Sequence, residues 1–369
     1  MPYFPAMRSV HRAAAVAAFA AAALGLAACS SSGSSSSSSA PATSAAASSS
    51  SSASASTPAA ATTSAAPKTM NIAYLSFAVD NSYDAPMLAA AQAVASADGA
   101  NLKVFDADNN PQTQFNQLQT VISSGQYNGI ITQPIESTGL VSLVKQAIAK
   151  GIKVVNMDQI LGSSLSTAAP QVAGLSANVT FVPTTIGTQL GQQVVAACAS
   201  KKLSPCKVGY LYDIKASSLD TAIYGAFTAA IKGSPVQVVT YGQSYFTPTI
   251  GLTAVETMLQ ATPGLDLIVG SDQGIEGAMT ALSTTDKSDH VLLVGYGASA
   301  AAVAGIQSGA VYSDVAQAPS AEGTDAVKAL VAAIETGKVS GTIDPVAGFP
   351  DSGVVNKADV SQFTPEWQG

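Results

Sequence analysis

The sequence predicts an α/β fold of two doubly wound lobes, each with a parallel sheet covered by helices on both faces. Short apolar runs alternate with stretches in which apolar residues recur every three or four positions, as strands and half-buried helices require. The alternation begins near Asn71 and restarts at Lys207, so it forms two successive series. The roughly 300 residues after Met70 are rich in Ala, Val, Ile, Leu and Gly, enough to build two such lobes.

The first series consists of four apolar runs with helical patterns between them. The expected strands are Ile72–Leu75, Leu102–Phe105, Gly129–Thr132 and Lys153–Asn156. Buried helix faces are expected at Met87–Ala97, at Phe115, Leu118, Val121 and Ile122, and at Leu140, Val144 and Ile148. A strand followed by a helix is the repeating unit of a parallel sheet.

The second series repeats this pattern. Its expected strands are Lys207–Leu211, Val236–Val239, Leu265–Val269 and Val291–Val294. Helices are expected around Ile223, Phe227 and Ile231, and around Val255, Met258 and Leu259. In open α/β sheets, ligands bind beyond the carboxyl ends of the strands, so the loops at those ends form the candidate site.

These loops contain polar and aromatic side chains. They are Asp80, Asn81, Tyr83, Gln133, Asp158, Gln159, Tyr245, Phe246, Ser271, Asp272 and Tyr296. Amides and carboxylates bind hydroxyls or amines, and rings provide flat apolar contact, so a polar ligand with apolar faces would suit them. The alternative is that they only cap strands and helices, because Asp and Asn are also favoured at helix N-caps.

Residues 1–28 have the pattern of a lipoprotein signal peptide. Arg8 and Arg12 precede the apolar run Ala13–Leu24, which is shorter than a bilayer-spanning helix. The segment Leu26-Ala27-Ala28-Cys29 then resembles the bacterial lipobox, which implies lipidation of Cys29. Ordinary secretion with a chance cysteine is the alternative. We expect a protein anchored by lipid on the extracytoplasmic face of the cell membrane.

Residues 29–69 are almost entirely Ser, Ala, Thr and Pro, so they lack the apolar side chains that a core needs, and we expect a disordered tether. The chain as a whole is acidic. Twenty-three acidic residues face sixteen basic ones, and the only two arginines lie in the predicted signal peptide. An acidic body disfavours nucleic acid as a partner. The missing guanidinium groups disfavour ligands that are recognised through a carboxylate or a phosphate.

Cys198 and Cys206 are the remaining cysteines. Because export favours oxidation, we expect them to form a disulfide that ties a helix end to the next strand, with two inert buried thiols as the alternative. Two cysteines without a histidine cluster argue against a metal site. The sequence has no Gly-rich phosphate fingerprint either, so no metal or cofactor is expected.

Several short segments together resemble those of type I periplasmic solute-binding proteins, especially the ribose and galactose group that serves ABC importers. They are Asn81-Ser82-Tyr83, Asp108-Asn109-Asn110, Asn128–Ile131, Gly151–Asp158, Gly270-Ser271-Asp272, Val294–Gly297 and Ala316–Pro319. The resemblance covers nearly the whole chain after Asn71. It implies two Rossmann-like lobes joined by three crossovers, near Ser176, Gln317 and Val346. The lobes would be residues 70–176 with 318–345, and residues 177–317 with 346–369.

The resemblance also implies a function: a monomer that traps a small solute by hinge closure and delivers it to an ABC permease in the membrane. The ligand positions of the family correspond here to Asn81, Tyr83, Gln133, Asp158, Gln159, Ser176, Phe246, Ser271, Tyr296, Gly297 and Gln317. At several ligand positions this chain has a different residue from the one that is common in the family. Gln159 stands where arginine is common, Ser271 where asparagine is common, and Gly297 where aspartate is common. An arginine common near Thr221 is absent.

Asp158 keeps the family carboxylate without an arginine beside it. An ionised carboxylate in a closed cleft is costly unless the ligand supplies donors. The hydroxyls of a polyol or the charge of an amine would supply such donors. The resemblance implies a neutral sugar or polyol, with a cationic or other small metabolite as the alternative.

Two other classes of function are alternatives to solute import. An enzyme has little support, because His290 is the only histidine outside the predicted signal peptide and Ser271 lies one place too early for a nucleophile elbow. A sensory binding protein, which presents its ligand to a membrane receptor, is not distinguished from an importer component by sequence. We expect no catalytic activity.

Overall fold

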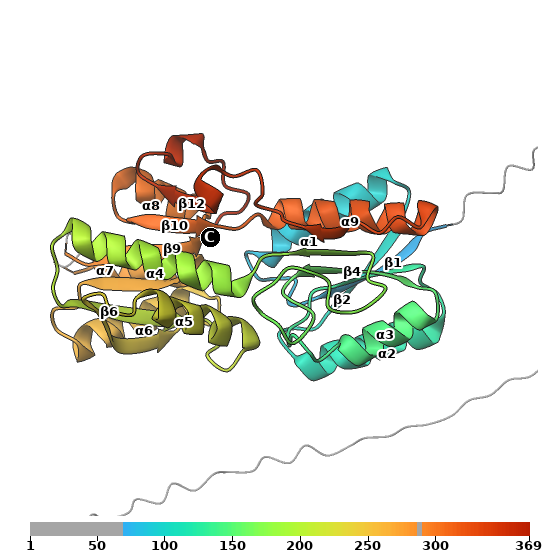
Figure 1. Ribbon diagram of the computed structural model, residues 1–369, viewed down its shortest axis with the longest axis horizontal. Helices are drawn as coiled ribbons and strands as arrows, with labels where there is room; N and C mark the ends of the chain where they lie inside the picture. Colours follow the sequence, from blue (N-terminus) through green and yellow to red (C-terminus); the bar gives the residue numbers. More distant parts are fainter. Residues whose placement is uncertain (1–68, 286–289) are drawn as a thin grey trace, which may run out of the picture. The chain divides into compact units, whose positions relative to one another are not determined.

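The computed structural model describes residues 69–285 and 290–369. The predicted signal peptide, Cys29 and the predicted tether up to residue 68 lie outside the described residues. Within the described part, the strands form two six-stranded sheets, each with helices on both faces (Figure 1). No helix in that part of the chain is both long and apolar enough to cross a membrane.

The first sheet has the strand order β11-β5-β4-β3-β1-β2, and each strand is parallel to its neighbours. Its strands are β1 (Asn71–Ser76), β2 (Asn101–Asp106), β3 (Gly129–Thr132), β4 (Lys153–Asp158), β5 (Ala177–Thr180) and β11 (Gly341–Ile343). Its helices are α1 (Asp84–Ala97), α2 (Pro111–Ser124), α3 (Val141–Ala149) and α9 (Pro319–Thr336).

Strand pleating divides the core of this lobe between two helix layers. Ile72 and Tyr74 pack toward α1 and α9, whereas Ala73 and Leu75 pack toward α2 and α3. Figure 1 shows the two helix pairs on opposite sides of the sheet. Both faces are buried, which explains why the strands read as continuous apolar runs.

The second sheet has the order β12-β10-β9-β8-β6-β7, and only its edge strand β12 is antiparallel to its neighbour. Its strands are β6 (Cys206–Tyr212), β7 (Val236–Gln243), β8 (Leu267–Ser271), β9 (Leu292–Gly297), β10 (Ser313–Ala316) and β12 (Val354–Asn356). Its helices are α4 (Pro183–Ser200), α5 (Ser218–Ala230), α6 (Pro248–Ala261), α7 (Asp272–Ser283) and α8 (Ala300–Ser308). Two short 3₁₀ turns, Pro350–Gly353 and Val360–Gln362, follow near the C-terminus.

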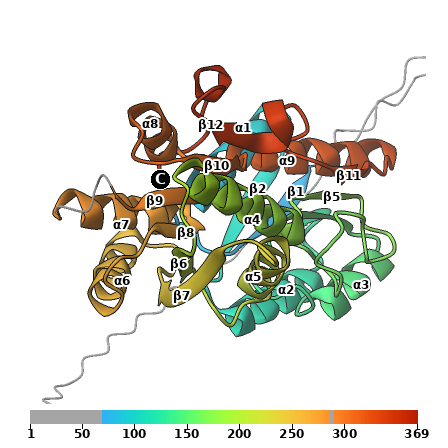
Figure 2. The same cartoon turned by 60° about the vertical axis from the view of Figure 1, so that its left-hand side comes forward.

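The second lobe is also covered on both faces. Tyr210 and Tyr212 point into the layer formed by α4 and α5, and Leu211 points into the layer formed by α6, α7 and α8. Figure 2 shows these layers on either side of the strands. The predicted fold class, two doubly wound parallel-sheet lobes, is confirmed, and the eight predicted strands correspond to β1–β4 and β6–β9.

The first predicted crossover is placed too early in the chain. Strand β5 pairs in parallel with β4, with Val155 opposite Ala177 and Asp158 opposite Thr180, so residues 177–180 belong to the first sheet. The chain therefore leaves the first lobe after Thr180, not at Ser176. The prediction missed β5 because the run Ala-Asn-Val-Thr is short and half polar; Asn178 is nevertheless buried, and its amide bonds to Asn156 and Thr180.

The other two passages between the sheets follow β10 and β11. After β10 in the second sheet, α9 packs on β3 and β4 of the first. After β11 in the first sheet, β12 pairs with β10 in the second.

The C-terminal segment is not confined to the second lobe. Trp367 is buried in the first lobe's core against Tyr83, with ring centroids 5.3 Å apart. Its indole N–H also donates to the carbonyl of Gly297 in the second lobe, at 2.9 Å. The assignment of residues 346–369 to the second lobe alone is therefore wrong at this residue, because one large aromatic side chain contacts both lobes.

The predicted disulfide between Cys198 and Cys206 is present, with an S–S distance of 2.06 Å. It joins the last turn of α4 to the first residue of β6.

Candidate functional site

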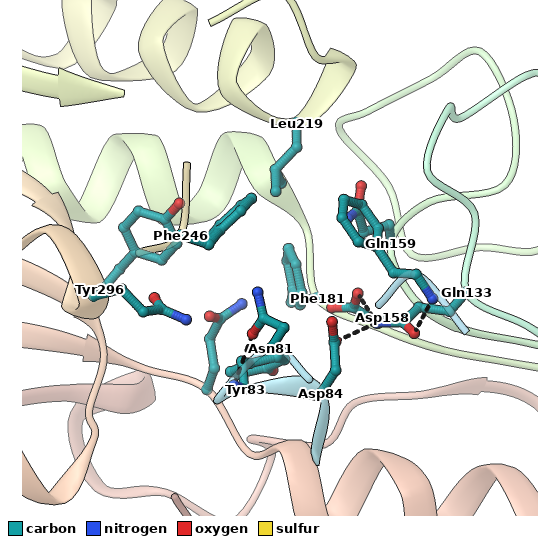
Figure 3. A pocket seen from close by; sticks show the side chains of 13 residues that line it. Asn81, Tyr83, Asp84, Gln133, Asp158, Gln159, Phe181, Leu219, Phe246 and Tyr296 are labelled. Carbon is teal, nitrogen blue, oxygen red and sulfur yellow. Dashed lines mark hydrogen bonds between the residues drawn. The ribbon is translucent and has the colours of Figure 1, made fainter. Parts of the chain in front are cut away.

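A cavity of about 450 Å³, partly open to solvent, lies where the carboxyl ends of strands from both sheets meet. It is lined by Phe77, Asn81, Tyr83, Asp84, Gln133, Asp158, Gln159, Phe181, Leu219, Phe246, Gln273, Tyr296 and Gln317 (Figure 3). The first lobe supplies the carboxylates, and the second supplies mainly rings and amides.

The segment from the end of β1 to the first residue of α1 carries four of the lining residues, Phe77, Asn81, Tyr83 and Asp84. The side-chain oxygen of Asn81 accepts from the backbone N–H of Tyr83 at 2.8 Å, which closes an Asx turn at the start of α1. Asp84 is the first residue of that helix, and its buried side chain points into the cavity floor. An aspartate in the first helical turn is also favoured by the helix dipole.

Gln133 joins two carboxylates. Its amide nitrogen donates to Asp84 at 2.5 Å and to Asp158 at 3.0 Å, and its amide oxygen accepts from the backbone N–H of Phe77 at 2.9 Å. Figure 3 shows the three side chains together on one side of the cavity. Asp158 ends β4 with a φ of 62°, a left-handed conformation that is uncommon for a residue with a side chain.

The loop that carries Gln133 is fixed from below by Gln114 of α2. The amide nitrogen of Gln114 donates to the carbonyl of Gln133 at 2.7 Å, and its oxygen accepts from the N–H of Ile135 at 3.0 Å. The side chain of Gln114 is fully enclosed, so the bridging position of Gln133 is held by a rigid neighbour.

A third carboxyl group lies behind this pair. Glu322 of α9 accepts a hydrogen bond from the hydroxyl of Tyr83 at 3.0 Å. Helix α9 can approach α1 this closely because Gly323 has no side chain; a Cβ there would lie 2.0 Å from the carbonyl oxygen of Met87. The close packing of α1 and α9 thus brings Glu322 next to Tyr83, which lines the cavity.

Burial dominates the electrostatics of this floor. It raises the pKa of Asp158 to about 7, although the hydrogen bond from Gln133 acts in the opposite direction. Burial also raises the pKa of Asp84 well above its ordinary value, and the neighbouring Asp158 adds to that effect. The pKa of Glu322 is raised well above normal, again first by burial and then by Asp158.

The second lobe contains a carboxylate too, but it lies behind the cavity wall. Asp213 accepts hydrogen bonds from the hydroxyls of Ser244 and Ser271, both at 2.5 Å, and from Tyr296 at 2.6 Å. These bonds hold the ring of Tyr296 against the cavity. Asp213 itself does not line it.

Two glutamine side chains in the cavity have unused hydrogen-bonding groups. Gln159 is 8% exposed and Gln317 is 6% exposed, and both line the cavity. Within the described residues, neither side-chain amide forms a hydrogen bond. Because both amides line the cavity and have no protein partner there, both groups are available to a polar ligand.

The structure brings together most of the residues that the sequence singled out. Asn81, Tyr83, Gln133, Asp158, Gln159, Phe246, Tyr296 and Gln317 all line the cavity. Ser176 does not, because it precedes β5 and so lies at the amino end of that strand, at the opposite edge of the sheet. Ser271 does not either, because its hydroxyl bonds to Asp213 and caps the start of α7.

Five lining residues were missed: Phe77, Asp84, Phe181, Leu219 and Gln273. Phe77 and Asp84 flank residues that were singled out, so position alone could have indicated them. Phe181 follows the unpredicted strand β5. Leu219 and Gln273 lie in the first turns of α5 and α7, where a helix start faces the cavity.

The aspartate that the family resemblance leads us to expect at Gly297 would not fit here. Gly297 has a φ of 135°, and a Cβ on it would lie 2.6 Å from the ring of Trp367. The indole ring therefore takes the space that this side chain would need. Within residues 69–285 and 290–369, no group of three or more His, Cys, Asp or Glu side chains could hold a metal ion.

Comparison with known proteins gives a consistent result. The family described as periplasmic binding protein domain matches residues 72–338. The ribose import binding protein of Bacillus subtilis (strain 168) is 26% identical over 246 residues, which cover 66% of this chain and 75% of that protein. The D-allose-binding periplasmic protein of Escherichia coli (strain K12) is 26% identical over 269 residues, or 72% of this chain and 83% of that protein.

Solved structures share the fold. An ABC transporter solute-binding protein from Mycobacterium smegmatis with bound glycerol has a TM-score of 0.67 at 23% identity, covering 82% of this chain and 99% of that one. A protein from the same species in complex with β-D-fucofuranose has a TM-score of 0.69 at 18% identity, covering 79% of this chain and 93% of that one.

Proposed function

The chain belongs to the periplasmic binding protein family, and from this premise we propose that it captures a small polyhydroxylated solute, a sugar or related polyol, in the cavity between its lobes. It then delivers the solute to an ABC importer. The curated relatives are named for ribose and allose, and structural neighbours hold glycerol or fucofuranose. We assign it no catalytic step and no cofactor.

The observation that carries this proposal is the arrangement of hydrogen-bonding groups around the cavity. Carboxylate oxygens of Asp84 and Asp158 lie on one side, and the free amides of Gln159 and Gln317 extend the polar lining. The rings of Phe181, Phe246 and Tyr296 complete the wall. Hydroxyl groups can donate to the carboxylates and bond to both ends of an amide, while the C–H faces of a sugar pack on rings.

Ligand capture by closure is supported by contacts across the mouth of the cavity. Gln273 of the second lobe donates to the hydroxyl of Ser82 in the first at 3.4 Å, and Phe77 meets Phe246 edge to face at 6.4 Å between ring centroids. These contacts are few and small. A ligand that touches both lobes therefore adds a substantial share of the contacts that favour the closed form, and so shifts the population toward it.

The proposal places the protein outside the cytoplasm as a monomer held by a lipid on Cys29. The Leu-Ala-Ala-Cys segment and the Ser- and Ala-rich stretch after it support this placement, because a lipid anchor and a flexible strap let the binding lobes reach a permease. Incorporation of radiolabelled palmitate into the unmodified protein, and its loss in Cys29→Ser, tests the anchor directly.

A thermal-shift screen of the purified protein against D-ribose, D-allose, D-galactose, D-arabinose and glycerol tests the function. A true ligand stabilises by about 2.7 kcal/mol at a hundredfold excess over Kd. We expect at least one polyol to raise Tm and, in small-angle scattering, to reduce the radius of gyration. Binding without compaction would contradict hinge closure. Failure of every polyol to bind would contradict the polyol assignment.

A further inference from the structure

The cavity floor holds more carboxylate groups than the surrounding side chains can pair with hydrogen-bond donors or cations. Asp84 and Asp158 share one amide nitrogen, that of Gln133, as their common side-chain donor. Glu322, directly behind them, has one oxygen bonded to Tyr83 and the other without any hydrogen-bond partner in the described residues. All three side chains are at least nine-tenths buried.

The cavity lining supplies no cation to balance these groups. The residues that line the cavity include no lysine, histidine or arginine. The lysines that contact aromatic rings, Lys103 and Lys215, lie over Phe105 and over Tyr212 and Tyr241, none of which lines the cavity. Buried carboxylates without a paired cation either keep a proton or await a positive ligand.

The rest of the cavity is suited to a cation that also carries hydroxyl groups. Phe77, Phe181 and Phe246 present rings to it, and aromatic faces attract ammonium groups. The unpartnered amides of Gln159 and Gln317, both more than nine-tenths buried, are independent signs of a bound polar molecule. A neutral sugar would satisfy the amides but leave the paired carboxylates without a countercharge.

We propose that the solute is an aminated polyol, such as an amino sugar or amino alcohol, whose protonated amine binds the carboxylates of Asp84 and Asp158 from the cavity side while its hydroxyls bond to Gln159 and Gln317. This inference rests on the proposed solute-binding function and narrows its ligand class. The two carboxylates thus select a positively charged ligand, and the two amides select one that carries hydroxyl groups.

The proposal predicts a coupling between binding and pH. The titratable groups that face the pair are Glu322 from α9, Tyr74 from β1, Tyr83 before α1 and Asp106 at the end of β2. In the free protein, burial makes Asp158 hold its proton up to about pH 7. An ammonium ligand favours the ionised pair, so binding releases a proton and affinity rises as pH increases through that value.

Calorimetric titration with matched pairs tests the proposal: D-glucosamine against D-glucose, and D-galactosamine against D-galactose and N-acetyl-D-galactosamine. We expect an amine to bind at least about tenfold more tightly than its neutral partners at pH 7, the preference that about 1.4 kcal/mol supports. The preference should grow from about pH 6 to about pH 7, and level off or fall above it, because the amine of a 2-amino sugar, like an α-amino group, loses its proton at about pH 7.7–8.0.

Asp158→Asn and Asp84→Asn should each remove most of the preference for the amine, and having two variants covers the case in which one fails to fold. Glu256→Gln is the matched control, because it removes one charge from an exposed position on α6 and should leave the preference unchanged.

The outcomes separate the two proposals. Neutral sugars that bind as tightly as the amines, or an unaltered preference in Asp158→Asn, would overturn the aminated-ligand proposal and leave the solute-binding function intact. Binding of neither series would count against both.

Discussion

The two lobes contain buried aspartates in very different settings. In the second lobe, Asp213 accepts hydrogen bonds from three hydroxyl groups and lies behind the cavity wall. In the first lobe, Asp158 has one side-chain donor, Gln133, which it shares with Asp84, and it lines the cavity. A carboxylate that the protein satisfies completely serves the structure, whereas one left short of donors and facing a cavity is available to a ligand.

The largest expected effect is on binding, at Asp158. Asp158→Ala removes an acceptor that the ligand would engage in a buried cavity, so we expect affinity to fall by about a hundredfold or more, as for a charge-assisted hydrogen bond worth roughly 3 kcal/mol. Calorimetric titration measures this. Folding should be little affected, because the substitution also removes a poorly paired buried carboxyl. Normal binding by the variant would mean that Asp158 is not a ligand residue.

Asp213→Ala should act mainly on stability. It leaves the hydroxyls of Ser244, Ser271 and Tyr296 without their acceptor, and unsatisfied buried groups cost about 1–3 kcal/mol each where water does not replace the partner. We expect the free energy of unfolding in urea to fall by about 3 kcal/mol. A stability equal to the unmodified protein would show that the hydroxyl cluster contributes little.

The pH dependence of unfolding distinguishes the two lobes through Asp158 and Asp220. Their folded-state pKa values are raised by burial, to about 7 and about 8. A raised carboxyl pKa means that the folded state binds more protons than the unfolded state, so each group lowers stability as pH rises from its ordinary range to the folded value.

In the unmodified protein, Asp158 should lower the free energy of unfolding as pH rises to about 7, and Asp220 should lower it as pH rises to about 8. Each decrease should be absent from the corresponding variant, Asp158→Asn or Asp220→Asn. Urea unfolding of the ligand-free protein at a series of pH values checks both. Identical pH profiles for the two variants and the unmodified protein would contradict the difference.

A smaller effect is expected for Tyr296→Phe. The change keeps the ring that lines the cavity but removes the hydroxyl that donates to Asp213 at 2.6 Å. We expect a loss of about 1 kcal/mol in stability and nearly unchanged ligand affinity. A large loss of affinity would indicate that the hydroxyl, and not only the ring, reaches the ligand.

The sequence predicted the repeating part of the fold well, because apolar runs such as Ile130-Ile131 and Val154-Val155 are buried on both faces of a parallel sheet. It failed for β5, β10, β11 and β12. In β5 and β10, Asn178, Ser313 and Asp314 are buried in strands. Their burial depends on hydrogen bonds to other strands and loops, such as that from Ala298 to Asp314, which no local pattern encodes.

The candidate site was predictable where residues follow a recognisable strand. Gln133 directly follows β3, Asp158 is the last residue of β4, and both line the cavity. Ser271 also ends a strand, yet its hydroxyl turns to Asp213, a partner 58 residues away in the sequence. Trp367, which fills the space beside Gly297, comes from the end of the chain. Such long-range contacts decide which end-of-strand residues face the ligand.

A crystal structure of the protein with its tightest-binding solute tests the central claim most directly. The account predicts ligand density in the cavity between the lobes, with a donor group within hydrogen-bonding distance of the carboxylate of Asp158 and an apolar face against the ring of Tyr296 or Phe246. A ligand bound elsewhere, or bound in the cavity without contact to Asp158, would contradict it.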